Sequence, residues 1–597
     1  MKLNPLIAGR KQYVLPKAKS FRWKLDVIEN QYPHHPNVIQ AAKDATCDLN
    51  LYPYSSNIQD KLLGQIAKYV NCEPKQIILT NGSDSALNLI CDCYVMSDTN
   101  VVIPQPTYPH MLQFVETRTK NLTNVDIKLG ELTQSITDRI ALSITETTNL
   151  CYLVSPNLPL GYVFYMEQIE SLLLQHPQTV FVVDLAYVEF GGIDYSELLI
   201  HKNLILVRTF SKMFGLAAIR LGYLYSHIEN INYMRAIVNE KSVTMCAIAT
   251  ASAAFDNLSY YNDIVSRIGI SKLEIAATLD KICSLASPIY GYNICGANFY
   301  LLLAHDTAAV CNVFAKHGIY VRDKHGDVPN SIRVAVGRPE QNRDVLDVIK
   351  LINLEYIFQT SKIVFDLDNT LRTGSKNSAI PYKGSRLLED YDSYICTNNA
   401  SYTPDEISRY FKENRILIES NRIYSPLTIA KQFLTGKYTV LGSQNIINYF
   451  GDSQPLSQNI DFVYLANKHF LDESTIIKLC KYKKQLFYTI GCDNINLDNY
   501  ADTDETGDTL IPDIGAIAKM MSTVISVIPI GKPNPNILPF TEDLVIIGDS
   551  DSDKQLAENK NALFIKIDPT ADIQCCFNNT IVMPSVNALY CYLNKEL

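Results

Sequence analysis

The sequence alternates short apolar runs with helical patterns, and this alternation starts again after about residue 360. Five apolar runs in the first part are QIILT (76–80), NVVIP (100–104), LCYLVSP (150–156), TVFVVD (179–184) and LILVRTF (204–210). Apolar strands separated by helical segments are typical of a mainly parallel sheet with helices on both faces. The first part of the chain therefore predicts an α/β fold.

The later segments divide the chain. Residues 228–290 lack strand signals and predict a long connecting helix, and residues 291–356 predict a smaller α+β unit closed by a helix. The short polar segment QTSK (359–362) marks a junction between two units, because the strand–helix alternation resumes at KIVFDLD. We therefore expect one unit over 1–356, a linker at 357–362 and a second unit over 363–597.

Composition excludes several classes of protein. At ~150 residues per domain, 597 residues allow three or four structural units, and 47% hydrophobic residues can fill large cores. A net charge of −9 without a long basic run argues against a nucleic-acid groove. The 15 cysteines show no CxxC pair, and no apolar run is long enough for a signal peptide or a membrane span. We expect a cytoplasmic protein that binds neither nucleic acid nor membrane.

A lysine follows one of the predicted strands and has chemically suitable neighbours. Lys212 lies just after LILVRTF, and Arg220 follows it by eight residues. Two other strands end near polar groups, Asp184 in VVD and Asn157 after LVSP. Alone, Lys212 is more simply interpreted as a surface lysine whose stem covers apolar residues, and only the neighbouring motifs favour a functional role.

Together these residues meet the requirements of pyridoxal phosphate. Its aldehyde needs a lysine, and its ring nitrogen needs a carboxylate so that the protonated ring can withdraw electrons. Its ring oxygen needs amide and phenol donors. Its phosphate needs an arginine and the start of a helix, for which LTNGSDSALNLI is suited.

Motifs in the same order resemble fold-type I aminotransferases, particularly histidinol-phosphate aminotransferases, over residues 1–356. They include LDVIENQYPHHPNVIQA, LNLYP, NGSDSAL, PTYP, SPNLPLG, VVDLAYVEF, RTFSKMFGLAAIRLGY, GANFYLLL, GIYVRD and IRVAVGRPEQN. The resemblance implies a large parallel-sheet domain, a small α+β domain and pyridoxal phosphate as cofactor. It also implies that Lys212 bonds the cofactor aldehyde and shuttles the proton, and that Asp184 pairs with the ring nitrogen. Tyr187 and Asn157 would hold the ring oxygen, and Tyr108 would stack on the ring.

The resemblance also implies a phosphate site, a substrate site and an oligomer. The phosphate cup would consist of Ser83, Asp84, Thr209, Ser211 and Arg220. Tyr52 would reach the phosphate from a neighbouring subunit, which implies a homodimer. Arg333 would bind a substrate carboxylate or phosphate, with Asn298 and Arg322 nearby.

One motif departs from the family pattern. The family usually has SPNNPTG, whereas Leu158 and Leu160 replace the second Asn and the Thr here. Because Asn157 is retained, we expect the contact with the ring oxygen to be retained as well. The local turn and the substrate pocket are expected to differ.

A second set of polar residues begins at KIVFDLDNTL. Asp366 ends an apolar run, and Asp368 follows two residues later. Alone, this stretch also fits a strand followed by an Asx turn. Three further runs end in polar clusters, which contain Thr397, Asn398, Lys532, Asp549, Asp551 and Asp553. We expect these clusters to meet at the carboxyl edge of one sheet, where sites of α/β proteins lie.

This set suits phosphoryl transfer to a carboxylate. One aspartate attacks phosphorus, and the other protonates the leaving alcohol and then activates water. A hydroxyl and a lysine neutralise the phosphoryl oxygens, and an acidic pair holds Mg²⁺.

The order and spacing resemble the haloacid dehalogenase superfamily of phosphatases over roughly residues 360–597, which implies a Rossmann-like core. The resemblance implies that Asp366 is the nucleophile and Asp368 the general acid and base. Implied substrate ligands are Thr397, Asn398 and Lys532. Implied magnesium residues are Asp366, Asp368, Asp549 and Asp553, with Asp551 an additional carboxylate.

The spacing also predicts an inserted cap. Asp368 and Thr397 are 29 residues apart, which is too short for a cap domain, whereas 135 residues separate Thr397 from Lys532. We expect an α/β cap at about 425–525, similar to the 4-nitrophenylphosphatase and sugar-phosphatase branch. Such a cap favours small phosphate esters, with Asp493 and Pro512–Gly515 near the leaving group.

Three functional hypotheses follow. The leading one is a bifunctional enzyme that aminates a phosphorylated ketone with a donor such as glutamate and then dephosphorylates the product. Dihydroxyacetone phosphate and imidazole acetol phosphate are the candidate ketones, and the altered turn and the large cap favour a small ketose phosphate. The second hypothesis is a decarboxylase of a phosphorylated amino acid fused to a phosphatase, and the third is a scaffold in which one half only binds a partner.

Overall fold

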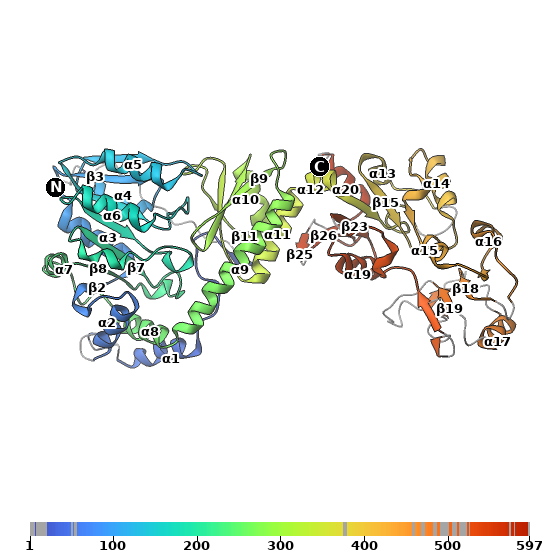
Figure 1. The fold of residues 1–597 in the computed structure, drawn as a ribbon, viewed down its shortest axis with the longest axis horizontal. Helices are drawn as coiled ribbons and strands as arrows, with labels where there is room; N and C mark the ends of the chain where they lie inside the picture. The colour runs from blue at the N-terminus through green and yellow to red at the C-terminus, as the bar shows by residue number, and fades with distance from the viewer. Residues whose placement is uncertain are drawn as a thin grey trace. The chain divides into compact units, whose positions relative to one another are not determined.

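In the computed structural model, the chain divides into two compact units, Met1–Ile352 and Asn353–Leu597 (Figure 1). The described residues are 6–7, 21–48, 50, 52, 57–373, 379–456, 460–466, 472–481, 486–489, 501–503, 510–512, 522–523, 526–541, 543–571, 575–577 and 579–594. The expected linker at 357–362 belongs to the second unit, because α12 (Leu354–Thr360) and the start of β14 (Lys362–Phe365) occupy it. Leu354, Ile357 and Phe358 are the buried residues that fix this helix.

A seven-stranded sheet forms the centre of the first unit. Its strands, in spatial order, are β2 (Ile77–Thr80), β8 (Gly222–Ser226), β7 (Leu204–Thr209), β6 (Val180–Asp184), β5 (Thr148–Val154), β3 (Asn100–Gln105) and β4 (Leu122–Asp126). All neighbours are parallel except β8, which is antiparallel to both β2 and β7. The predicted α/β sheet is therefore confirmed, and its five predicted strands are present.

Helices cover this sheet. The chain alternates its strands with α3 (Gly82–Tyr94), α4 (Pro109–Glu116), α5 (Thr133–Ser143), α6 (Met166–Gln175) and α7 (Ile228–Arg235). On one side, Ile90 of α3 and Met111 of α4 join Val101, Tyr152 and Val207 of the sheet in one buried cluster. Each crossover places the carboxyl end of a strand next to the start of a helix, which is where the first site lies.

Helices also connect the sheet with a smaller layer. In place of the expected single helix at 228–290, the described residues form α7, α8 (Met245–Asp256) and the 25-residue α9 (Leu258–Ile282). The remaining helices of this unit are α1 (Pro36–Asp44), α2 (Ile58–Tyr69), α10 (Thr307–Lys316) and α11 (Pro339–Ile352). The smaller sheet has the order β12 (Arg322–Asp323), β13 (Ser331–Ala335), β10 (Phe299–Ala304) and β9 (Ile289–Ile294), as expected for an α+β layer. Separately, β1 (Trp23–Lys24) pairs with β11 (Ile319–Tyr320).

The second unit has its own seven-stranded sheet. Its order is β16 (Ile423–Tyr424), β15 (Ser393–Cys396), β14, β23 (Leu544–Gly548), β24 (Leu563–Ile567), β26 (Thr580–Met583) and β25 (Cys575–Phe577). Only the β25–β26 pair is antiparallel. Its helices are α13 (Leu387–Asp390), α14 (Pro404–Glu413), α15 (Pro426–Phe433), α19 (Asp551–Lys560) and α20 (Val586–Leu593). Because β14, β15 and β23 are parallel, their carboxyl ends share one edge.

A smaller parallel sheet interrupts this order between β16 and β23. It consists of β17 (Tyr438–Leu441), β18 (Phe462–Leu465), β19 (Leu486–Thr489) and β22 (Ser526–Pro529), with α16 (Gln444–Phe450) and α17 (Glu473–Lys481). A two-stranded pair, β20 (Ala501–Thr503) and β21 (Leu510–Pro512), follows β19. This insertion covers most of the segment expected to form a cap, whereas Asp493 and 513–515 lie outside the described residues.

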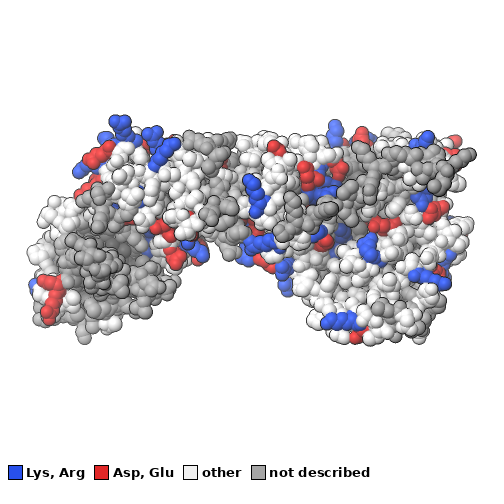
Figure 2. Space-filling view, turned by 180° about the vertical axis from the view of Figure 1, so that it is seen from behind, with Lys and Arg blue, Asp and Glu red and all other residues white. Residues whose placement is uncertain are grey.

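The surface carries both signs of charge. On the face seen in Figure 2, lysine and arginine side chains of the described residues alternate with aspartate and glutamate. Within the part of the chain that the structure describes, no helix combines the length and hydropathy needed to cross a bilayer.

Candidate active sites

The first unit contains a cavity of about 210 Å³ at the carboxyl ends of β5, β6 and β7. Its lining consists of Val27, Glu29, Ser83, Asp84, Tyr108, Val154, Leu158, Asp184, Ala186, Tyr187, Thr209, Ser211, Lys212, Ala217 and Arg220. The parallel strands bring together most of the residues predicted from the first set of motifs.

Lys212 follows β7 and contacts the segment just after β1. Its Nζ donates to the carbonyl oxygens of Val27 and Ile28, each at 3.2 Å. Burial, together with the positive charge of Arg333, lowers the pKa of Lys212 to about 8. At neutral pH a minor fraction of this amine is therefore neutral and nucleophilic, far more than for an exposed lysine.

Asp184 is the last residue of β6 and is 4% exposed. Its carboxylate accepts hydrogen bonds from Tyr152 Oη at 2.9 Å and from the Ala186 amide at 3.0 Å. Burial raises the pKa of Asp184 to about 6 despite these donors. A cation beside this carboxylate would stabilise its ionised form.

A glycine turn begins the helix that faces the cavity. Gly82 has φ of 73°, and a Cβ at this position would lie 2.6 Å from Arg220 Nη2. Arg220 itself adopts the left-handed region at φ 54° and precedes β8. Ser83 follows in the first turn of α3, and the Thr209 hydroxyl donates to the Ser211 hydroxyl at 3.0 Å. Hydroxyls, a helix start and a guanidinium therefore surround one end of the cavity.

Asp84 links this end of the cavity to Tyr108. Tyr108 Oη donates to one oxygen of Asp84 at 2.7 Å, and Arg220 Nη2 donates to the other at 3.1 Å. Burial alone would raise the pKa of Asp84, but hydrogen bonds from His110 and Tyr108 and the charge of Arg220 together lower it. Asp84 thus orients both the arginine and the aromatic ring.

The structure differs from the expectation at Asn157. Its side chain is 1% exposed, accepts a hydrogen bond from the Leu160 amide at 3.0 Å and donates to Tyr162 Oη at 3.2 Å. The next residue, Leu158, lines the cavity instead, and Asn157 is not among the lining residues. The expected contact between Asn157 and a cofactor ring is therefore not supported, because the turn directs its amide into the protein.

Two residues predicted for substrate binding lie on neighbouring strands of the smaller sheet. Arg333 in β13 is the register partner of Arg322 in β12, and its Nη2 donates to the Asp26 carbonyl at 2.7 Å. Asn298 is fully buried, and neither polar atom of its side-chain amide has a hydrogen-bond partner among the described residues. An unsatisfied buried amide is suited to a polar ligand.

Tyr52 is not among the residues that line the cavity. Its side chain is 57% exposed, and Lys241 Nζ lies 5.3 Å from the centre of its ring.

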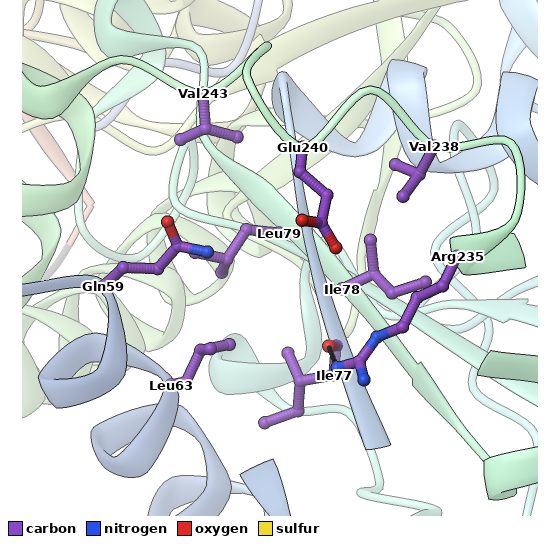
Figure 3. Close-up of a pocket in the computed structure, with 9 residues that line it drawn as sticks. All are labelled: Gln59, Leu63, Ile77, Ile78, Leu79, Arg235, Val238, Glu240 and Val243. Atoms are coloured by element: carbon purple, nitrogen blue, oxygen red, sulfur yellow. Dashed lines mark hydrogen bonds between the residues drawn. The ribbon is translucent and has the colours of Figure 1, made fainter. Parts of the chain in front are cut away.

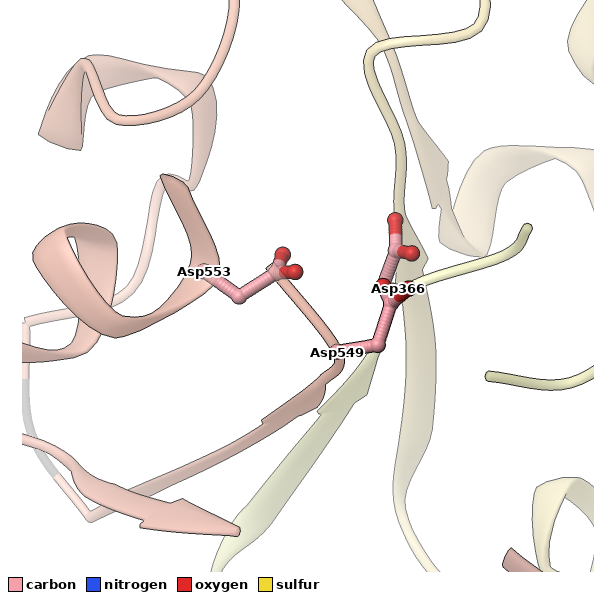
Figure 4. A group of neighbouring side chains, drawn as sticks. All are labelled: Asp366, Asp549 and Asp553. Carbon is pink, nitrogen blue, oxygen red and sulfur yellow. The ribbon is translucent and has the colours of Figure 1, made fainter. Parts of the chain in front are cut away.

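The second unit brings three predicted carboxylates together. Asp366 and Asp549 follow the adjacent strands β14 and β23, and Asp553 lies in the first turn of α19. Figure 4 shows the three side chains, which each offer an oxygen within 4.8 Å of the others. Burial raises the pKa of Asp366, and the neighbouring Asp553 adds to this effect, while Lys532 opposes it.

Lys532 neutralises part of this charge. Its buried ammonium contacts both Asp366 and Asp553. The Asn398 side chain fixes its backbone, since Oδ1 accepts from the Lys532 amide at 2.7 Å and Nδ2 donates to its carbonyl at 3.2 Å. Thr397 follows β15 and is 1% exposed, with its hydroxyl accepting from the Asn399 amide at 3.0 Å.

Asp368 does not belong to the carboxylate cluster. Its Oδ1 accepts from Arg372 Nε at 2.8 Å and lies 2.7 Å from Nη2, and its Oδ2 accepts from Asn399 Nδ2 at 2.9 Å. The sequence reasoning missed Arg372 and Asn399. Arg372 lies four residues after Asp368, but in a loop this spacing does not predict in which direction a side chain points.

A second cavity in the first unit is much smaller. It has a volume of about 50 Å³ and is shown in Figure 3, where Gln59, Glu240 and Arg235 surround the apolar residues of β2. The Arg235 guanidinium donates to the Ile77 carbonyl at 3.3 Å. None of the residues predicted for the sites lines this cavity.

Comparisons with known proteins agree with the geometry of the first cavity. The family model "Aminotransferase class I and II" matches residues 23–349. The chain belongs to the class I and II aminotransferases.

Several members of this family resemble the first unit. A dihydroxyacetone phosphate transaminase of Campylobacter jejuni is 30% identical over 332 residues, which cover 55% of this chain and 89% of that protein. Histidinol-phosphate aminotransferase 2 of Legionella pneumophila is 26% identical over 360 residues, covering 58% and 95%. The structure of histidinol-phosphate aminotransferase from Sinorhizobium meliloti in complex with pyridoxal-5'-phosphate matches with a TM-score of 0.50 at 21% identity, covering 58% of this chain and 98% of that one. This structural likeness shows the fold.

The aminotransferase cavity fits pyridoxal phosphate, the cofactor expected for the family. Lys212 can bond its aldehyde, Asp184 can pair with its ring nitrogen, and Tyr108 offers an aromatic face. The close approach of Gly82 to Arg220 places the start of α3 beside a guanidinium, a combination suited to binding a phosphate. The donors present therefore match the chemical groups of the cofactor, with the exception of the amide expected for its ring oxygen.

Proposed function

We propose that the chain catalyses two consecutive reactions, the amination of a small phosphorylated ketone and the removal of phosphate from the product. The proposal is carried by the cluster of Asp366, Asp549 and Asp553 around Lys532, which follows an aminotransferase unit in the same chain. Dihydroxyacetone phosphate and imidazole acetol phosphate are the candidate ketones, with glutamate as amino donor. The names of the two aminotransferase relatives above, which both refer to phosphorylated compounds, support this class of substrate.

In the first reaction, Lys212 acts as the proton carrier. When bound, pyridoxal phosphate would supply the ring that withdraws electrons from the carbon bonded to nitrogen. A pKa near 8 lets Lys212 Nζ accept and return a proton at neutral pH. Arg333 and Asn298 would bind the acidic group of the substrate, as their buried polar atoms suggest.

The second reaction is phosphoryl transfer in a haloacid dehalogenase-like unit. The Asp366 carboxylate attacks phosphorus while Asp368 gives a proton to the leaving alcohol oxygen. Water then attacks phosphorus, and Asp368 takes a proton from this water. Inorganic phosphate is released, and the free carboxylate of Asp366 is regenerated. Lys532 neutralises phosphoryl charge. The three carboxylates are hard oxygen ligands that would hold Mg²⁺ as a further counter-charge, and the inserted sheet would act as a cap over small esters.

We also propose a homodimer formed through the aminotransferase unit, in which Tyr52 of each copy completes the site of the other. The motif resemblance and the exposure of Tyr52 support this arrangement.

The experiment follows both products at once. The protein is incubated with glutamate and a panel of phosphorylated ketones, and 2-oxoglutarate and free phosphate are measured together. We expect Asp366→Asn to abolish phosphate release and to leave 2-oxoglutarate formation intact. Lys212→Ala should abolish 2-oxoglutarate formation and leave phosphate release intact when the amino-alcohol phosphate is supplied directly. Turnover without an amino donor and with release of CO₂ would instead identify a decarboxylase.

A further inference from the structure

The wall of the aminotransferase cavity carries an unexpected side chain. Leu158 lines the cavity there and is 8% exposed, whereas the polar neighbour Asn157 is turned away. The turn is held by hydrogen bonds from the Gly161 amide to the Asn157 carbonyl at 3.0 Å and from the Asn157 amide to the Tyr162 carbonyl at 2.8 Å.

The amide of Asn157 is also fully used. Its oxygen accepts from the Leu160 amide and its nitrogen donates to Tyr162 Oη, both inside the protein. Turning the side chain into the cavity would leave these two buried partners unsatisfied, which is costly. Asn157 is therefore unsuited to replace the donor that Leu158 lacks.

The chemistry of the cofactor places its ring oxygen at this wall. In pyridoxal phosphate the aldehyde lies opposite the ring nitrogen, and the oxygen and the phosphate arm flank the aldehyde on opposite sides. With Asp184 at the nitrogen, Lys212 at the aldehyde and Arg220 at the phosphate, the oxygen faces the remaining lining residues. Among these, Leu158 offers hydrocarbon and Tyr187 offers a hydroxyl.

We propose that, among the described residues, Tyr187 is the sole side-chain donor to the ring oxygen of the cofactor, and that Leu158 leaves the other side of that oxygen without a hydrogen bond. Tyr187 is 4% exposed and lies with its ring 5.3 Å from Lys212 Nζ. Burial raises the pKa of Tyr187, so that its hydroxyl keeps its proton and remains a donor.

This arrangement has a spectroscopic consequence. A donor draws charge from the ring oxygen and weakens its attraction for the proton on the adjacent Lys212 nitrogen. Where the donor is missing, the proton therefore stays on the nitrogen up to a higher pH. The visible absorbance band of the bound cofactor, which reports this proton, is expected to titrate at a higher pH than it would with an amide at position 158.

The test is an absorbance titration of the full-length holoenzyme. We expect Leu158→Asn to lower the midpoint by about one pH unit or more, since hydrogen bonds to charged groups are among the strong ones. Leu160→Thr, which restores the other altered position of the same turn away from the cavity, is the matched control and should leave the midpoint unchanged. Equal midpoints for Leu158→Asn and the natural protein would overturn the proposal.

A second variant covers the case in which Leu158→Asn fails to fold or to bind cofactor. We expect Tyr187→Phe to raise the midpoint, because it removes the remaining donor. If both variants fold, Tyr187→Phe should shift the midpoint less in the Leu158→Asn background, where the amide compensates. An unchanged midpoint in Tyr187→Phe would show that another group binds the oxygen and would equally overturn the proposal.

Discussion

At the scale of single residues, burial rather than position in the chain sets the chemistry of the first site. Lys212 and Asp184 are both surrounded by protein, and burial shifts the pKa of each toward neutrality, downward for the amine and upward for the carboxyl. The sequence indicated which residues lie at the strand ends. It contained no information on how far their proton affinities move, because this depends on packing around them.

The pKa of Lys212 gives a pH-dependent prediction. Only the neutral amine bonds the cofactor aldehyde, so the rate at which cofactor-free protein regains visible absorbance should rise about tenfold per pH unit below pH 8. Above pH 8 the rate should level off. Stopped-flow absorbance between pH 6 and 10 measures this profile, with Lys212→Arg as a control that gains no band. A rate that still rises at pH 10, as for an exposed lysine, would contradict the prediction.

Asn157 shows where motif reasoning stops. Adjacent residues of a turn face different directions, and no periodicity distinguishes them, in contrast to a strand or a helix. The motif therefore located the turn correctly, but it predicted that Asn157 lines the cavity, whereas Leu158 does. Arg372 was missed for a similar reason, because it contacts Asp368 through a loop.

At the scale of elements, the sites depend on how strands end and helices begin. The predictions for β6, β7, β14 and β23 succeeded because long apolar runs end in a polar residue, which is typical of buried parallel strands. The antiparallel β8 was not predicted, because strand direction depends on pairing between residues far apart in the sequence. The junction after β23 is particularly tight, since Gly548 precedes Asp549 and lies against Asp553 of α19.

Gly548→Ala should disturb this junction. A Cβ would lie 2.3 Å from Asp553 Cγ, which forces the carboxylate or the start of α19 to move. We expect phosphate release in the proposed second reaction to fall at least about tenfold, since misplacing reacting groups is costly, while transamination is unchanged. Gly269→Ala is the control, because the structure shows open space at this position of α9 and alanine favours a helix by about 1 kcal/mol. Wild-type phosphate release by Gly548→Ala would argue against a role for this cluster.

Helix α14 offers an element-scale prediction on stability. Thr403 and Glu406 form a capping box, with the Glu406 amide donating to Thr403 Oγ1 at 3.2 Å. Thr403→Ala should lower the free energy of unfolding of the second unit by ~1 kcal/mol. Denaturant unfolding measures the change, and Thr403→Ser should retain most of the stability. Equal losses for both variants would assign the effect to lost packing rather than to the cap.

At the scale of the whole molecule, each unit has its own core and its own candidate site. Separate cores allow separate unfolding, and a ligand raises the stability only of the unit that binds it. The sequence located the restart of the strand–helix pattern near residue 360, but the buried side chains of α12 place the division a few residues earlier.

Calorimetry of the full-length protein should therefore show two transitions. We expect pyridoxal phosphate to raise one of them and Mg²⁺ the other, each by about 2.7 kcal/mol at a ligand concentration 100 times the dissociation constant. Lys212→Ala should remove most of the first shift, and Asp549→Asn together with Asp553→Asn the second. A single transition that responds to both ligands would indicate that the units unfold together.

The division into two units within one chain also fixes stoichiometry. The aminotransferase unit and the candidate hydrolytic unit are always synthesised in equal numbers, whatever the level of expression. The steady-state amount of any shared metabolite would then depend on the turnover numbers of the two centres and not on the relative abundance of two gene products.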